Sequence, residues 1–122
     1  MIIGTYTHLS WIIKNGFLAE QYNATLFTKM FWDSLLFLDF LAAILLILKP
    51  KKGIFLTLTI IVIDVIHNNI FYFEELYLND IKLIEWLFNY WMILGQILFA
   101  FFVIITFKLA LKGISNTSIL YD

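Results

Sequence analysis

The sequence predicts an all-α membrane protein, folded as a four-transmembrane-helix up-down bundle, and three observations lead to this fold class. Of the 122 residues, 62% are apolar and only 14% are charged, whereas a soluble domain is about 45–50% apolar and about 25% charged. The mean hydropathy of the chain is +0.91. Long uncharged stretches recur, and a helix needs about 20 such residues to cross the hydrocarbon core. We therefore expect a single integral membrane domain over residues 1–122.

Four stretches have the length and composition of membrane spans. The clearest contains Trp86–Phe107, which is 22 residues without a charge. An upstream span is interrupted by Asp64 and His67, and the span before it ends in a nearly pure run of Leu, Ile, Phe and Ala in which Asp39 is the exception. The expected spans cover approximately residues 2–19, 25–48, 54–73 and 84–107.

The N-terminal stretch 2–19 allows two interpretations. It is long enough to cross a membrane, but it carries the polar residues His8, Ser10, Lys14 and Asn15. Its apolar residues favour a span. The alternative is three spans preceded by an amphipathic segment that lies on the external membrane surface.

Lysines predict the orientation of the chain. The connection Lys49–Gly53 holds three lysines beside Pro and Gly, which indicates a tight turn on the cytoplasmic side. The acidic connection Glu74–Lys82 is then external, and Lys108 and Lys112 place the C-terminus inside. With four spans both termini are cytoplasmic. Richness in Ile, Phe, Lys and Asn without Arg favours a bacterial inner membrane.

Composition also excludes several classes of function. The net charge is -1, and eight lysines without arginine form no basic block, so no nucleic-acid partner is expected. The absence of Cys removes thiolate metal sites and Cys nucleophiles. Common catalytic signatures and glycine-rich nucleotide loops are missing, so the sequence leans away from an enzyme and implies no cofactor.

Charged and polar side chains within the spans are the candidate site. A charge near the bilayer centre costs at least about 2.5–3.5 kcal/mol on insertion scales, so each one needs an explanation. Asp39 lies nine residues from Leu48 and Asp64 ten from Ile54, which places both about 14–15 Å from the cytoplasmic boundary. The candidate ligand- or ion-binding residues are Asp33, Asp39, Asp64, His67, Asn68, Gln96 and Lys14.

Asp64, His67 and Asn68 share one face of a helix, because they stand at i, i+3 and i+4. They are interpreted first as an interhelical hydrogen-bond network and second as a ligand or proton site. Asp64 and His67 are a weak candidate metal pair, and no metal site is otherwise expected.

The remaining candidates have individual expected roles. Asp33 and Asp39 are six residues apart, about 240° around a straight helix, so we expect them to face different surroundings. Lys14 is expected to be a structural counter-ion, and Gln96 is expected to donate or accept a hydrogen bond between helices.

The leading functional hypothesis is a small polytopic membrane protein with an acidic and His-containing polar centre. This centre would bind or conduct a small cation, a proton, or a lipid-like or amine ligand. A chain this short encloses little volume, so its partners besides the lipid bilayer are expected to be further copies of itself or another membrane subunit. One alternative is a structural or regulatory membrane subunit without a ligand. Another is a lipid-modifying membrane enzyme that uses Asp64 and His67.

Overall fold

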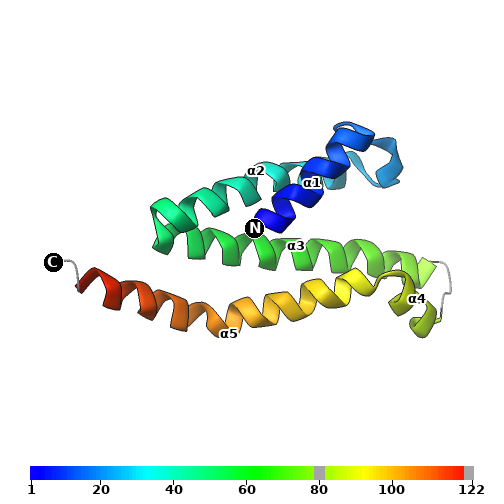
Figure 1. The fold of residues 1–122 in the computed structure, drawn as a ribbon. Helices are drawn as coiled ribbons and strands as arrows, with labels where there is room; N and C mark the ends of the chain where they lie inside the picture. Colours follow the sequence, from blue (N-terminus) through cyan, green and yellow to red (C-terminus); the bar gives the residue numbers. More distant parts are fainter. Residues whose placement is uncertain (79–81, 120–122) are drawn as a thin grey trace. The chain divides into compact units, whose positions relative to one another are not determined.

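The computed structural model describes residues 1–78 and 82–119, and this part of the chain is mostly helical and has no strand. Figure 1 shows the order of the elements along the chain. The predicted all-α class is therefore confirmed. The elements are α1 (Ile2–Asn15), a 3₁₀ turn η1 (Glu20–Tyr22), α2 (Leu26–Leu48), α3 (Pro50–Leu78), α4 (Leu83–Asn89) and α5 (Trp91–Ile119).

The chain divides into two compact units, Met1–Thr57 and Leu58–Asp122. The first unit contains α1, η1, α2 and the start of α3. The second contains the rest of α3 with α4 and α5. The single domain expected over 1–122 stays a prediction, and the two units are described separately below.

Among the described residues, three helices are long and apolar enough to cross a membrane, as in an integral membrane protein. They are Leu26–Leu48, Pro50–Glu74 and Trp91–Ile114, with 23, 25 and 24 residues. At about 1.5 Å of rise per residue, each exceeds the roughly 30 Å of a hydrocarbon core. Two of these correspond to the predicted spans 25–48 and 54–73.

The expected span 2–19 is not formed as a single helix. The helix α1 has only 14 residues, and about 20 are needed to cross. Gly16 stops it by adopting a φ of 86°, a left-handed backbone conformation that suits glycine. Leu18 follows with a φ of 54°. The three-span alternative accommodates this short helix, whereas the four-span bundle is not confirmed.

The expected span 84–107 is also divided. The helix α4 ends at Asn89, and Tyr90 leaves the helical conformation with φ −117° and ψ 35°. Its successor α5 begins at Trp91, so the membrane-length segment lies further along the chain than predicted. The physical reason is packing: Trp86 is only 3% exposed and donates its Nε1–H to the Tyr72 carbonyl of α3 at 3.0 Å.

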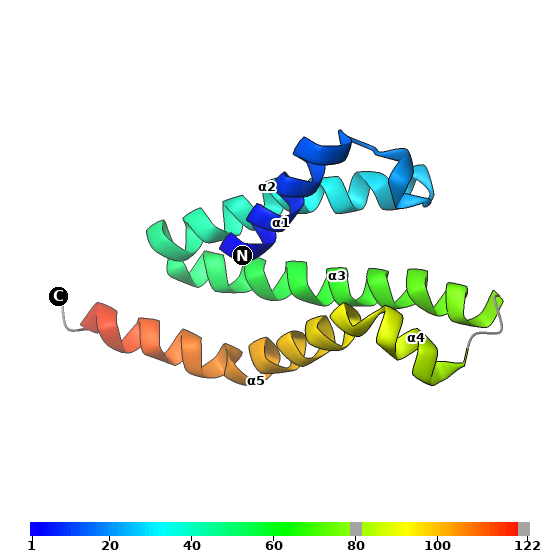
Figure 2. The same ribbon diagram turned by 45° about the vertical axis from the view of Figure 1, so that its right-hand side comes forward.

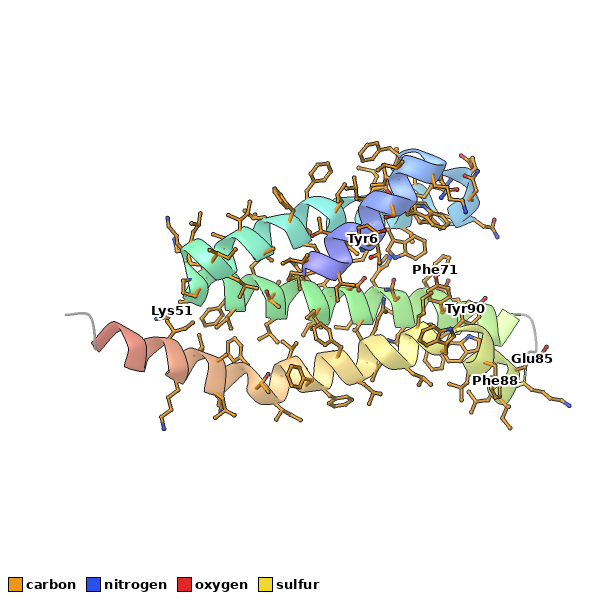
Figure 3. All side chains as sticks on the ribbon, viewed as in Figure 1. Tyr6, Lys51, Phe71, Glu85, Phe88 and Tyr90 are labelled. Carbon is orange, nitrogen blue, oxygen red and sulfur yellow. The ribbon has the colours of Figure 1, made fainter. Side chains whose placement is uncertain are left out.

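The lysine-rich connection is a tight turn, as predicted. Only Lys49 separates α2 from α3, and Pro50 opens α3, a position where proline costs no helical hydrogen bond. Figure 3 labels the neighbouring Lys51 at the start of α3. Gly53 is buried against the end of α2: an added Cβ would lie 2.7 Å from the Leu45 carbonyl carbon and the Leu46 Cα.

In the first unit, α1 packs along α2, as Figures 1 and 2 both show. Apolar side chains from the two helices and their connection are buried in this unit. The side chain of Thr25 caps α2 by accepting a hydrogen bond from the Thr28 N–H at 3.3 Å. The buried apolar residues of the first unit are Ile12, Ala19, Trp32, Leu35 and Ala42.

Large apolar side chains cover the outside of the span-length helices. Phe37 on α2 is 61% exposed, and Leu98 and Ile105 on α5 are 70% and 71% exposed. A soluble monomer rarely shows such continuous apolar surface. It is the surface expected where lipid is the solvent.

The tight turn generates the first prediction. Gly53→Ala is expected to lower the free energy of unfolding by about 1–3 kcal/mol, because the new methyl group overlaps the backbone of α2. Unfolding in detergent, followed by circular dichroism, measures this change. Gly95→Ala is the matched control, since nothing lies within 4 Å of its added Cβ. Equal stability of the two variants would contradict the close helix contact.

Candidate functional site

The three aspartates at membrane depth lie in three different surroundings. Asp33 and Asp39 are both on α2 in the first unit, and Asp64 is on α3 in the second. Asp33 and Asp39 are 5% and 7% exposed, and Asp64 is half-buried. We examine each with the side chains that contact it.

Asp33 fastens the segment after α1 to α2. Its Oδ2 accepts a hydrogen bond from the Leu18 backbone N–H at 2.6 Å, and its Oδ1 accepts one from the Tyr22 hydroxyl at 2.9 Å. Both carboxylate oxygens are thus engaged. Leu18 is one of two non-glycine residues with positive φ in the described chain, and a charge-assisted hydrogen bond to its N–H stabilises this uncommon conformation.

Aromatic rings enclose the contact between Asp33 and Tyr22. The Tyr22 ring stacks on Trp11 of α1, with ring centroids 5.1 Å apart, and lies 5.0 Å from the Trp32 ring of α2. Burial, followed by the hydrogen bond to Asp33, raises the pKa of Tyr22 above its usual range. The phenol is therefore a neutral hydrogen-bond donor at physiological pH. Helical spacing could not indicate Tyr22, because this residue lies in an irregular connection.

His8 is a half-buried residue of α1, and the charge of Asp33 influences its pKa. Burial lowers the pKa of His8 below its ordinary value of 6.5, and the Asp33 charge opposes this shift only in part. His8 is therefore a neutral imidazole at pH 7. His8 is visible in the sequence as a polar residue of the N-terminal stretch, but its proximity to the charge of Asp33 depends on the fold.

The two lysines of the first unit near the polar residues have different surroundings. Lys14 is exposed at the end of α1 and makes no ion pair within residues 1–78 and 82–119, so its expected role as a structural counter-ion stays a prediction. The largely buried Lys29 of α2 places its Nζ 3.0 Å from the Glu20 Oε2, and the Glu20 side chain is 95% exposed. Lys29 thus buries its aliphatic stem and directs its charge outward, as lysines near membrane surfaces do.

Asp39 is buried against the backbone of α1. A Cβ added at Gly4 would overlap the Asp39 Oδ2 and lie 3.1 Å from its Cγ. Within residues 1–78 and 82–119, Asp39 makes no hydrogen bond and no ion pair. The Met1 amino group acts on it electrostatically without pairing.

Asp33 and Asp39 lie in different surroundings, although both side chains are buried. Asp33 holds the connection after α1, whereas Asp39 contacts α1 near its start.

The second unit contains a polar triad, which we define as Asp64, Asn68 and Gln96. The Asn68 Nδ2 donates to the Asp64 Oδ1 and to the Gln96 Oε1, each at 3.0 Å. Asn68 is 5% exposed. The bond to Gln96 joins α3 to α5, as expected for an interhelical polar contact at membrane depth. His67 is half-buried on α3 beside this triad in sequence.

Metal-ligand geometry was tested with the same side chains. In residues 1–78 and 82–119, no group of three or more His, Asp or Glu residues is placed to share a metal ion. Structural and catalytic zinc sites need at least three protein ligands. The weak candidate pair of Asp64 and His67 stays a prediction.

Comparison of the chain with protein-family models, curated proteins and solved structures finds no match. Its function is therefore inferred from the side chains and their geometry.

The Asp33 contact generates the second prediction. Asp33→Ala is expected to speed hydrogen exchange of the Leu18 amide at least tenfold in detergent, because a hydrogen bond to a charged group contributes about 1.5–3 kcal/mol. Mass spectrometry or NMR measures the exchange. Ser34→Ala is the control, since the Ser34 hydroxyl donates only to the Phe31 carbonyl of its own helix. Unchanged protection of Leu18 in Asp33→Ala would contradict the contact.

The polar triad generates the third prediction. A double-mutant cycle between Asn68→Ala and Gln96→Ala should give a coupling energy of about 0.6–1.7 kcal/mol, the range for hydrogen bonds between membrane helices. Reversible unfolding in mixed detergent measures it. Asn69→Ala is the matched control, because its amide bonds the Val65 carbonyl within α3. Equal coupling of Asn68 and Asn69 to Gln96 would rule out the interhelical bond.

Proposed function

We propose that this chain is a small integral membrane protein that takes up a proton or a small cation at Asp39. The observation that carries the proposal is the burial of this carboxyl without a hydrogen bond or ion pair in the described residues. Burial disfavours the charged form of a carboxyl group. Asp39 is most stable when a proton neutralises it or a cation compensates its charge.

Asp39 differs in this respect from the other two aspartates at membrane depth. Asp33 accepts two hydrogen bonds, and Asp64 accepts one from Asn68. Hydrogen bonds that favour the ionised form reduce the need for proton uptake. Of the three aspartates, only Asp39 is therefore proposed as the uptake site.

The contact with Gly4 restricts what could bind there. Even one added methyl group at Gly4 would overlap the Asp39 carboxyl. Space of this size favours a proton over a bulky amine or lipid headgroup. A small cation would need a slight separation of α1 from α2, so the proton is the simpler occupant.

The membrane placement that we propose follows the lysines. The turn carrying Lys49, Lys51 and Lys52 lies on the cytoplasmic side, and the C-terminal end of α5 lies there too. The short α1 supports the three-span arrangement, in which the N-terminal segment lies in the external half. A bacterial inner membrane and assembly with further copies or another membrane subunit belong to the same proposal.

A structural or regulatory subunit is the second candidate function. It is favoured by the use of polar side chains in contacts between segments, as in the Asn68–Gln96 bond and the two bonds to Asp33. Such contacts position helices without any ligand. In the described residues nothing favours the lipid-modifying enzyme.

The fourth prediction tests Asp39 directly. In protein reconstituted into vesicles, the infrared carbonyl band of a protonated carboxyl should be present in the parent and absent in Asp39→Asn. The pH-dependent part of this band should disappear with it, because asparagine preserves the shape but has no titrating proton. Thermal unfolding should differ little, since a neutral side chain replaces a neutral one.

Asp33→Asn is the matched control, and it should keep the band. Raising the sodium or potassium concentration at constant pH distinguishes proton binding from cation binding, because a bound cation would displace the proton and weaken the band. Persistence of the band in Asp39→Asn would refute the proposed site. Loss of folding in that variant would instead favour the structural subunit.

A further inference from the structure

The short helix α4 presents three different sides. Ile84 and Phe88 are 70% and 79% exposed and share a face, being four residues apart. Leu83, 57% exposed, lies about 100° from Ile84 on the side away from Phe88. The exposed Glu85 lies on the opposite flank, about 60° from Phe88. Trp86, about 200° from Ile84, is buried. Figure 3 labels Glu85 and Phe88 on this helix.

Packing within the second unit fixes the orientation of α4. The buried Trp86 donates its Nε1–H to the Tyr72 carbonyl at 3.0 Å, and its ring lies 5.3 Å from the Phe73 ring. Tyr90 closes the same cluster, with its ring 4.8 Å from Tyr72 and 5.7 Å from Trp86. Figure 2 shows α4 set at an angle to α5, beyond its start. The apolar side of α4 is therefore held outward by its buried side.

This outward side continues a surface that already has the character of a lipid contact. Candidate spans end at Glu74 on α3 and begin at Trp91 on α5, so α4 lies between two membrane-span ends in sequence. At the start of α5, Trp91 and Met92 are 68% and 66% exposed. Tryptophan and tyrosine concentrate at the level of the headgroups, where one end of the ring is wet and the other apolar.

We propose that α4 is an interfacial anchor, with Ile84 and Phe88 inserted among the lipid chains just below the headgroups and Glu85 directed toward water at the edge of that face. Lipid fits this surface better than a second protein does. Two side chains on a seven-residue helix cover far less than the roughly 1,200–2,000 Å² of a stable protein interface. Their exposed faces also continue the lipid-type surface of α5.

The anchor would fix the depth of α5. Because α4 and Trp91 meet at the break near Tyr90, insertion of Ile84 and Phe88 sets where the membrane-spanning part of α5 starts. Hydrophobic length alone allows several registers, since mismatch costs only fractions of a kcal/mol per Å.

Spin labelling of single cysteines tests this proposal in the full chain, which contains no native cysteine. Labels at Phe88→Cys, Ile84→Cys, Glu85→Cys and Phe99→Cys are placed in vesicles of phosphatidylethanolamine and phosphatidylglycerol. Collision with oxygen reports lipid exposure, and collision with a water-soluble nickel chelate reports water exposure. Phe99, which is 48% exposed on α5, marks the interior of the bilayer.

The expected result is a shallow lipid position for the labels at 84 and 88, with oxygen collision above that at 85 and nickel collision at least threefold below it. The label at 99 should be deeper still. Labels at 84 and 88 as accessible to nickel as the label at 85 would overturn the proposal. Labels reached by neither reagent would also overturn it, because a protein surface would then cover α4.

Discussion

The controlling constraint in this chain is the cost of placing a polar group where water is absent. The backbone avoids this cost by forming helices, in which its N–H and C=O groups bond to each other, since an unsatisfied group in hydrocarbon costs several kcal/mol. Side chains have no such general solution, so each polar residue in a span needs its own partner. In the second unit Asn68 provides one, and its amide nitrogen contacts oxygens on both α3 and α5. The polar residues consequently determine which helix faces meet, while the apolar majority determines only that helices form.

Asp33 shows how the same constraint shapes an irregular segment. The connection between α1 and α2 contains left-handed residues at Gly16, Leu18 and Asn23. The Gly16 and Asn23 N–H groups still bond to the Ile12 and Glu20 carbonyls of the preceding helical turns, whereas the Leu18 N–H bonds to a side chain. The carboxylate of Asp33 accepts the Leu18 N–H and the Tyr22 hydroxyl, so a buried charge and an unbonded backbone donor compensate each other. Neither group would be stable there without the other.

Sequence periodicity predicted what depends on helical geometry. The shared face of Asp64 and Asn68 follows from their spacing. An interhelical role for Gln96 was expected from its depth, but its pairing with Asn68 was not predicted. The break at Tyr90 could not be predicted, because Trp86 is as apolar as its neighbours and only its contact with Tyr72 sets α4 apart. The pairing of Lys29 with Glu20 could not be predicted either. Glu20 lies in the irregular connection between α1 and α2, and hydropathy does not show where such a connection places its side chains relative to α2.

The two ends of α1 are secured by different interactions. Next to its C-terminal end, the Asp33 carboxylate holds the backbone through charge-assisted hydrogen bonds. Near its N-terminal end, Gly4 packs on the Asp39 carboxyl without a hydrogen bond or ion pair in the described residues, and the Met1 amino group acts on that carboxyl electrostatically. A change of charge at Asp39 would therefore act on the end of α1 that no hydrogen bond to α2 holds in the described part of the chain. Because a ligand shifts a conformational equilibrium only through its differential affinity for the two states, the proposed uptake of a proton at Asp39 would favour the arrangement in which α1 packs over a neutral carboxyl.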